Sequence, residues 1–121
     1  MAAILVVDDD QDIREALIEI LSDEGHTASG AGNGAEALVS LRQFPRPDLI
    51  LLDLMMPVMN GWDFTAEIAK DPVLSQIPVV LLSGGGELQQ HADSLRVTAF
   101  LVKPIKVDAL LTMVEAVSGA A

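Results

Sequence analysis

Four short runs of consecutive apolar residues recur along the chain. They are ILVV (4–7), LILL (49–52), VVLL (79–82) and FLV (100–102), and TASGA (27–31) is a weaker candidate for an edge strand. A strand with one wet face alternates apolar and polar residues, whereas a strand covered on both faces is apolar throughout. The runs therefore predict a parallel sheet that lies between two layers of helices.

The stretches between these runs carry apolar residues at the spacing of amphipathic helices. This spacing predicts helices over 13–21, 33–41, 62–70 and 107–117. Asn33 stands where a helix-capping residue is expected. Residues 83–98 are mostly polar and include three consecutive glycines, so we expect a loop followed by a short helix there. The order of strands and helices predicts a doubly wound α/β domain.

Composition narrows the possible functions. With 121 residues we expect one domain, covering 1–121. Its 18 acidic and 7 basic residues give a net charge of −11, which disfavours direct contact with nucleic acid. The chain has no cysteine, which excludes disulfides and thiolate chemistry. It shows neither a signal-peptide pattern nor an apolar stretch of membrane-spanning length, so we expect a cytoplasmic protein that does not bind membranes.

Polar residues follow the predicted strands at their carboxyl ends. The first run ends in DDD (8–10), the third strand in Asp53, the fourth in Ser83 and the fifth in Lys103. The carboxyl ends of parallel strands lie along one edge of the sheet, where ligands bind at the point at which the strand order reverses. We therefore expect these residues, distant in sequence, to form one site.

Acidic residues gathered at one edge repel one another unless a cation compensates. Lys103 supplies one positive charge, and Mg²⁺ suits a site of few carboxylates with water and phosphate oxygens. A carboxylate can also act as a nucleophile and hold an acyl phosphate. The residues Asp8, Asp9, Asp53, Ser83 and Lys103 thus make a plausible set for phosphoryl transfer.

Simpler explanations exist for some of these residues. Acidic residues are common at helix N-termini, and we favour that explanation for Asp10 and Asp12. For Asp8 and Asp9 taken alone, capping and metal binding explain the sequence equally well. Ser83 alone carries little information. The functional interpretation depends on finding suitable residues at the ends of four different strands.

Four motifs in this order resemble those of one protein family. They are LVVDDD (5–10), DLMMPVMNG (53–61), LLSG (81–84) and FLVKP (100–104). The chain resembles the receiver domain of two-component response regulators over essentially its whole length. The resemblance implies a flavodoxin-like fold with five parallel strands in the order 2-1-3-4-5 and helices on both faces.

The resemblance also implies roles for individual residues. Asp53 would accept a phosphoryl group from a phosphohistidine on a histidine kinase or a histidine phosphotransfer protein. Asp8 and Asp9 would hold Mg²⁺ together with Asp53, and the backbone carbonyl of Met55 would complete the protein ligands. Lys103 would pair with the phosphoryl oxygens. Arg14 matches a position that is often basic in the family, and we assign it no chemical role.

A conformational switch is the output that the resemblance implies. Ser83 would bond the phosphoryl oxygens and move toward them, and Phe100 would fill the space that is vacated. The face built from the fourth helix, fifth strand and fifth helix would change, and an unidentified downstream protein would bind it. Because the apolar Met55 cannot hydrogen-bond a water, we expect slow self-dephosphorylation.

Three other functions fit parts of the sequence. A phosphatase of the haloacid-dehalogenase type requires a second acidic residue two positions after the nucleophile. This chain has Met55 there, which argues against that function. A flavodoxin-like flavin binder requires hydroxyl and amide groups after the first strand to bind the phosphate. Here DDD (8–10) would repel a phosphate, which argues against that function. A degenerate receiver that serves only as a docking module, independent of phosphorylation, stays possible but is not favoured, since every residue of the acceptor site is present.

Overall fold

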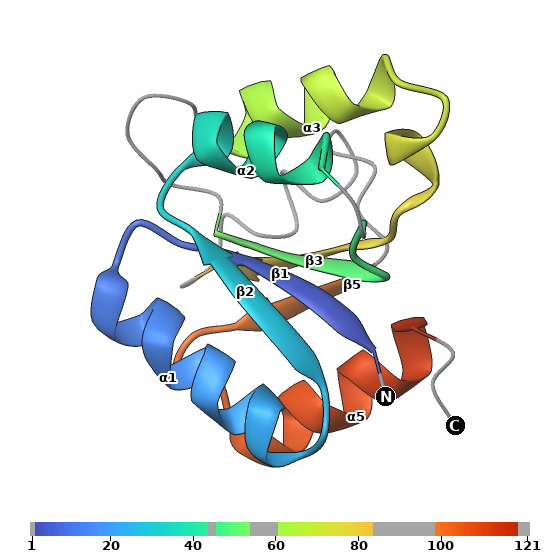
Figure 1. The fold of residues 1–121 in the computed structure, drawn as a ribbon. Coiled ribbons are helices and arrows are strands. Elements are labelled where there is room, and N and C mark those ends of the chain that lie inside the picture. Colours follow the sequence, from blue (N-terminus) through green and yellow to red (C-terminus); the bar gives the residue numbers. More distant parts are fainter. Residues whose placement is uncertain (1, 44–45, 54–60, 84–98, 119–121) are drawn as a thin grey trace.

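The computed structural model describes residues 2–43, 46–53, 61–83 and 99–118. In chain order its elements are β1 (Ala3–Val7), α1 (Gln11–Asp23), β2 (Thr27–Ala31), α2 (Gly34–Leu41), β3 (Leu49–Asp53), α3 (Gly61–Ala69), the 3₁₀ helix η1 (Leu74–Gln76), β4 (Val79–Ser83), β5 (Ala99–Val102) and α5 (Val107–Ser118) (Figure 1). The helix expected after Ser83 falls outside the described residues. None of the helices in the described ranges is long and apolar enough to cross a bilayer.

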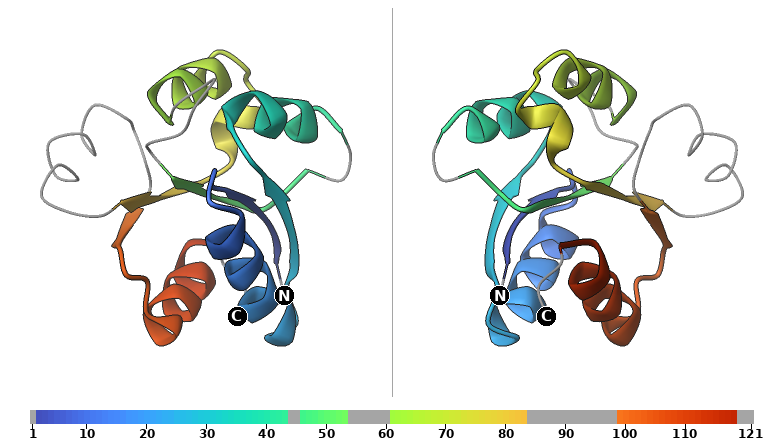
Figure 2. Two further views of the ribbon diagram at one scale, coloured as in Figure 1. Left: turned by 90° about the vertical axis from the view of Figure 1, so that its left-hand side faces the viewer. Right: turned by 90° about the vertical axis from the view of Figure 1, so that its right-hand side faces the viewer.

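The five strands form one parallel sheet in the order β2-β1-β3-β4-β5. This confirms the predicted flavodoxin-like topology, in which the strand order reverses between β1 and β3. Helices α1 and α5 cover one face of the sheet, and α2 and α3 cover the other, as Figures 1 and 2 show. The weak candidate at 27–31 is the edge strand β2, paired in register with β1.

The two faces of the sheet explain the continuous apolar runs. Successive side chains of a strand point to opposite faces. In β1, Ile4 and Val6 belong to the core beneath α1 and α5, whereas Leu5 and Val7 belong to the core beneath α2 and α3. Every residue of β3 is buried. A polar residue at these positions would lose its hydration on either face, so both faces select apolar residues.

Side-chain caps fix the starts of α1 and α2. The carboxylate of Asp10 accepts hydrogen bonds from the backbone N–H groups of Asp12 and Ile13, at 3.0 and 3.2 Å. The predicted capping role of Asp10 is therefore confirmed. Asn33 caps α2 by accepting from the N–H of Glu36 at 2.9 Å, also as predicted. The cap at Asp10 directs its side chain toward α1 rather than toward the acidic residues that precede it.

The Asp71 side chain accepts hydrogen bonds from the backbone N–H groups at the start of η1, and this contact links stability to pH. The pKa of the Asp71 carboxyl lies below its usual value of 3.8, first because it accepts hydrogen bonds from the N–H groups of Leu74 and Val73, and then because Arg46 and Arg42 attract its charge. A carboxyl with a lowered pKa in the folded protein stabilises the fold above its unfolded pKa. That contribution is lost as the pH falls through the folded pKa.

We therefore predict that Asp71→Asn, which keeps an oxygen acceptor but removes the charge, lowers the urea midpoint modestly at about pH 7. The difference from the unmodified chain should shrink as the pH falls to about 3, because the carboxyl is then largely protonated in the unfolded chain and the stabilisation that its charge gives is being lost. Urea unfolding at both pH values measures this. A difference of equal size at the two pH values would show that the charge of Asp71 is not what stabilises η1.

Candidate functional site

Three carboxylates meet at the carboxyl ends of β1 and β3. Asp8 and Asp9 directly follow β1, and Asp53 is the last residue of β3. One oxygen of each lies within 4.8 Å of the other two. The two strands are neighbours, with Val7 level with Leu52, so the residues that follow them reach the same edge of the sheet. The predicted gathering of these acids is therefore present in the structure.

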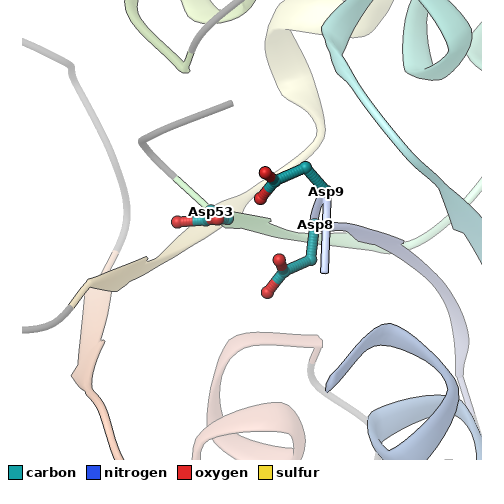
Figure 3. Close-up of side chains that lie close together, drawn as sticks. All are labelled: Asp8, Asp9 and Asp53. Atoms are coloured by element: carbon teal, nitrogen blue, oxygen red, sulfur yellow. The ribbon is translucent and has the colours of Figure 1, made fainter. Parts of the chain in front are cut away.

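Figure 3 shows how the three side chains are arranged. Asp8 and Asp9 lie on either side of Asp53, and all three carboxylates point beyond the strand ends. Asp8 is fully buried and Asp53 is 7% exposed, whereas Asp9 is exposed. The cluster is thus open to a ligand on one side and surrounded by protein on the other.

Backbone hydrogen bonds hold Asp8 in place. Its N–H donates to the carbonyl of Ala31 in β2 at 3.1 Å, which continues the strand pairing by one residue. Its carboxylate Oδ1 accepts from the N–H of Asp10 at 2.9 Å. The carboxylate is therefore oriented by the turn that leads into α1.

Lys103 faces the cluster from β5. Its Nζ lies 3.5 Å from Asp8 Oδ2 and 3.7 Å from Asp53 Oδ1. Lys103 follows β5, and β4 separates that strand from β3, so only a long side chain can reach the carboxylates from there. The Lys103 side chain is 25% exposed. The structure thus brings together Asp8, Asp9, Asp53 and Lys103, as the sequence predicted.

The remaining predicted residues are placed only in part. Ser83 ends β4, level with Val102 of β5, so its backbone lies at the same edge of the sheet. Its side chain is outside the described residues, as is the whole of Met55. Phe100 lies in β5 opposite Leu81 and is 39% exposed. Its side chain is therefore partly exposed to solvent.

The charges and donor atoms of the cluster suit a hard divalent cation. Among the described residues, the three carboxylates of the cluster and the one ammonium paired with them leave a formal excess of two negative charges. Such an excess at a largely buried site is unfavourable without a counter-charge. All of the side-chain donors are oxygen, the ligand type that Mg²⁺ prefers, and one of them is open to water. The residues present therefore fit Mg²⁺.

One contact at the site was not expected from the sequence. Arg14 of α1 donates from Nη1 to the main-chain carbonyl of Asp8 at 2.7 Å. A hint was present in the sequence, since Arg14 lies six residues after Asp8, near the start of a predicted helix. What the sequence does not show is that this side chain turns back toward the strand end.

Comparison with known sequences shows the family to which the chain belongs. Residues 4–115 match the response regulator receiver domain family. Protein PilH of Pseudomonas aeruginosa is 34% identical over 119 residues, which cover 97% of this chain and 98% of PilH. The DNA-binding response regulator MtrA of Mycobacterium tuberculosis is 38% identical over 120 residues, which cover 93% of this chain. The match covers 49% of MtrA, so the chain spans about half the length of this relative.

Solved structures give the same result. The chemotaxis protein CheY4 of Vibrio cholerae has a TM-score of 0.88 and 31% identity, with 97% of this chain and 98% of that chain covered. The family match includes β1, β3 and β5, the strands that carry the acidic residues and Lys103. The chain therefore belongs to the response regulator receiver domain family of two-component signalling proteins.

Proposed function

We propose that this chain is a single receiver domain, spanning residues 1–121, whose Asp53 accepts a phosphoryl group in the cytoplasm. The donor would be a phosphohistidine on a histidine kinase or a histidine phosphotransfer protein. One observation carries the proposal: the Asp53 carboxylate ends a buried strand within 3.7 Å of the Lys103 ammonium and beside two further carboxylates. A solvated strand end would not gather these groups.

The reaction follows from this arrangement. A carboxylate oxygen of Asp53 attacks the phosphorus atom of the phosphohistidine. An O–P bond forms as the P–N bond breaks, and the electron pair of that bond stays on the imidazole, which takes a proton from solvent. The product is an acyl phosphate on Asp53. The Lys103 ammonium, which lies near both Asp8 and Asp53, can then pair with the transferred phosphoryl oxygens.

In this proposal, Asp8, Asp9 and Asp53 hold Mg²⁺ through side-chain oxygens. The backbone carbonyl of Met55, which lies outside the described residues, would add a further ligand. Bound there, Mg²⁺ supplies positive charge where phosphoryl and carboxylate oxygens meet. The fully buried Asp8 contributes a fixed position, because its carboxylate is also bonded to the N–H of Asp10.

The output would be a change on the face formed by β5, α5 and the expected fourth helix, which lies outside the described residues. Phosphorylation adds negative charge and strong acceptors at one edge of the sheet. Ser83 would bond the phosphoryl group, and Phe100, now 39% exposed, would turn inward. A shallow hollow lies on this face between β5 and α5, where Leu101 and Met113 line it together with the charged residues Lys106 and Asp108. A downstream protein that binds one form more tightly would shift the equilibrium toward it.

A small phosphodonor tests the acceptor role directly. Incubation with acetyl phosphate and Mg²⁺ should add one phosphoryl group to the protein, and hydroxylamine should remove it, since it cleaves acyl phosphates. Peptide mapping should locate the group on Asp53. A protein that gains no phosphoryl group under these conditions would instead be a docking module.

The lifetime of the acyl phosphate gives a separate prediction. Since the apolar side chain of Met55 cannot hydrogen-bond an attacking water, the phosphoryl group should persist for longer than seconds after the donor is removed. Following the phosphorylated mass with time measures this lifetime. Decay within seconds would show that another group activates water.

Lys103 should couple phosphorylation to the output face. In the Lys103→Ala protein, Asp53 can still be modified, but no ammonium pairs with the phosphoryl oxygens to draw β5 toward them. We predict that the amide signals of α5, observed by NMR, keep their unphosphorylated positions. Lys70→Ala, which removes an exposed lysine paired with Glu67 on α3, is the matched control and should shift as the unmodified chain does. A full shift of the α5 signals in Lys103→Ala would contradict this role.

A further inference from the structure

We propose that Arg14 is a positioning residue for the metal site, which holds the peptide unit between Asp8 and Asp9 so that both carboxylates face the ion. This inference rests on the magnesium site proposed above. It concerns a side chain outside the acidic cluster, which would act on the ion only through the backbone that carries two of its ligands.

The first observation is the hydrogen bond itself. The guanidinium Nη1 of Arg14 lies 2.7 Å from the carbonyl oxygen of Asp8, a short distance typical of a charge-assisted bond. That carbonyl belongs to the peptide unit that joins Asp8 to Asp9. The orientation of this carbonyl is tied to ψ of Asp8 and φ of Asp9, the two dihedral angles that set how these residues are placed relative to each other. A donor fixed on its oxygen therefore restrains the backbone that carries both carboxylates.

The second observation is that β2 leaves room for the arginine. A Cβ atom placed on Gly30 would lie 2.9 Å from Cδ of Arg14, 3.1 Å from its Cγ and 3.0 Å from Cδ1 of Ile18. The aliphatic stem of Arg14 therefore lies directly over Gly30. The backbone of Gly30 is not in the left-handed region, so space rather than conformation calls for glycine at this position.

The charge of Arg14 and its position would change Mg²⁺ affinity in opposite directions. Arg14 carries a positive charge close to a site that would bind a cation. If charge alone mattered, removing it would strengthen Mg²⁺ binding, because one repulsive interaction would be lost. A positioning role predicts the opposite, since ligands that are no longer oriented bind more weakly. Groups that orient metal ligands typically contribute about 10- to 100-fold to metal affinity.

Two variants separate these explanations. Arg14→Met keeps an unbranched stem but removes the guanidinium, whereas Gly30→Ala keeps every charge and displaces the arginine. We expect both to weaken Mg²⁺ binding about 10-fold or more, measured by NMR titration of the full chain. Arg42→Met, at the exposed end of α2, is the matched control and should bind Mg²⁺ as the unmodified chain does.

A readout without the ion completes the test. The N–H of Asp10 donates to the Asp8 carboxylate, so its hydrogen exchange reports on the loop in Mg²⁺-free protein. We expect faster exchange of this amide in both variants than in Arg42→Met. Should Arg14→Met fail to fold, Gly30→Ala carries the test, since it retains all polar groups.

The outcomes distinguish this inference from the function on which it rests. An unmodified chain that does not bind Mg²⁺ would overturn the proposed metal site, and the exchange of the Asp10 amide would still show whether Arg14 orders the loop. If the unmodified chain binds Mg²⁺ but Arg14→Met binds it equally or more tightly, the positioning role alone is wrong. Unchanged binding by Gly30→Ala would count against it in the same way.

Discussion

The Asp53→Asn protein should gain no phosphoryl group from acetyl phosphate under conditions that modify the unaltered chain. The amide has no anionic oxygen to attack phosphorus, so we expect incorporation to fall to background rather than to decrease partially. Asparagine has nearly the same shape as aspartate, and the fold should be kept. The change removes the charge 3.7 Å from the Lys103 ammonium, but Lys103 keeps Asp8 as a partner and one of three mutually repelling carboxylates is lost. The urea midpoint in Mg²⁺-free buffer should therefore not fall.

Asp23→Asn is the matched control for this experiment. It makes the same chemical change at an exposed position. Asp23 is the last residue of α1, and the site lies next to the other end of that helix. This variant should be modified at the rate of the unaltered chain. Persistent incorporation in Asp53→Asn, labile to hydroxylamine, would show that another carboxylate is the acceptor.

Removal of Mg²⁺ should have the second largest effect. Without a divalent ion, the three carboxylates and Lys103, taken among the described residues, carry a formal excess of two negative charges, which repels the incoming phosphoryl group. Metal ions at such sites contribute several kcal/mol, and each 1.36 kcal/mol corresponds to a factor of ten in rate. We therefore expect a chelator to slow the modification of Asp53 at least about 100-fold.

Restoring Mg²⁺ should recover the rate, whereas NaCl at the same ionic strength should not. This comparison separates binding at the site from general screening of the net charge of −11. Equal rates with and without the chelator would contradict a role for the ion in the transfer.

The sequence was most informative where one physical constraint decides the residue type. Every residue of β3 is covered on both faces, so its apolar run and its end at Asp53 could be recognised without coordinates. Parallel topology then brings the ends of β1 and β3 together, which is why the meeting of Asp8 with Asp53 was predictable. The meeting of Lys103 with Asp53 was predictable by the same reasoning, because Lys103 directly follows β5.

Other features depend on distances between elements that sequence patterns do not report. Helix α1 starts at Gln11, before Ile13, the first apolar residue of its pattern. It starts there because the Asp10 side chain accepts hydrogen bonds from the N–H groups of Asp12 and Ile13. The contact from Arg14 to the Asp8 carbonyl depends on how closely α1 approaches β2 at Gly30. Neither the periodicity of apolar residues nor the position of a strand end reports that approach, so no role for Arg14 could be predicted from the sequence.

The central claim is that acidic residues from β1 and β3 hold one divalent ion within reach of Lys103. Mn²⁺ accepts the same oxygen ligands as Mg²⁺ and broadens the NMR signals of nearby nuclei. Trace Mn²⁺ should therefore broaden the amides of Asp8, Asp9, Asp53 and Lys103 first, and excess Mg²⁺ should restore them. Asp23 is an acidic residue at the far end of α1. If its amide broadens as much as those of the site, Mn²⁺ binds the negatively charged chain without preference for the site, which would contradict the claim.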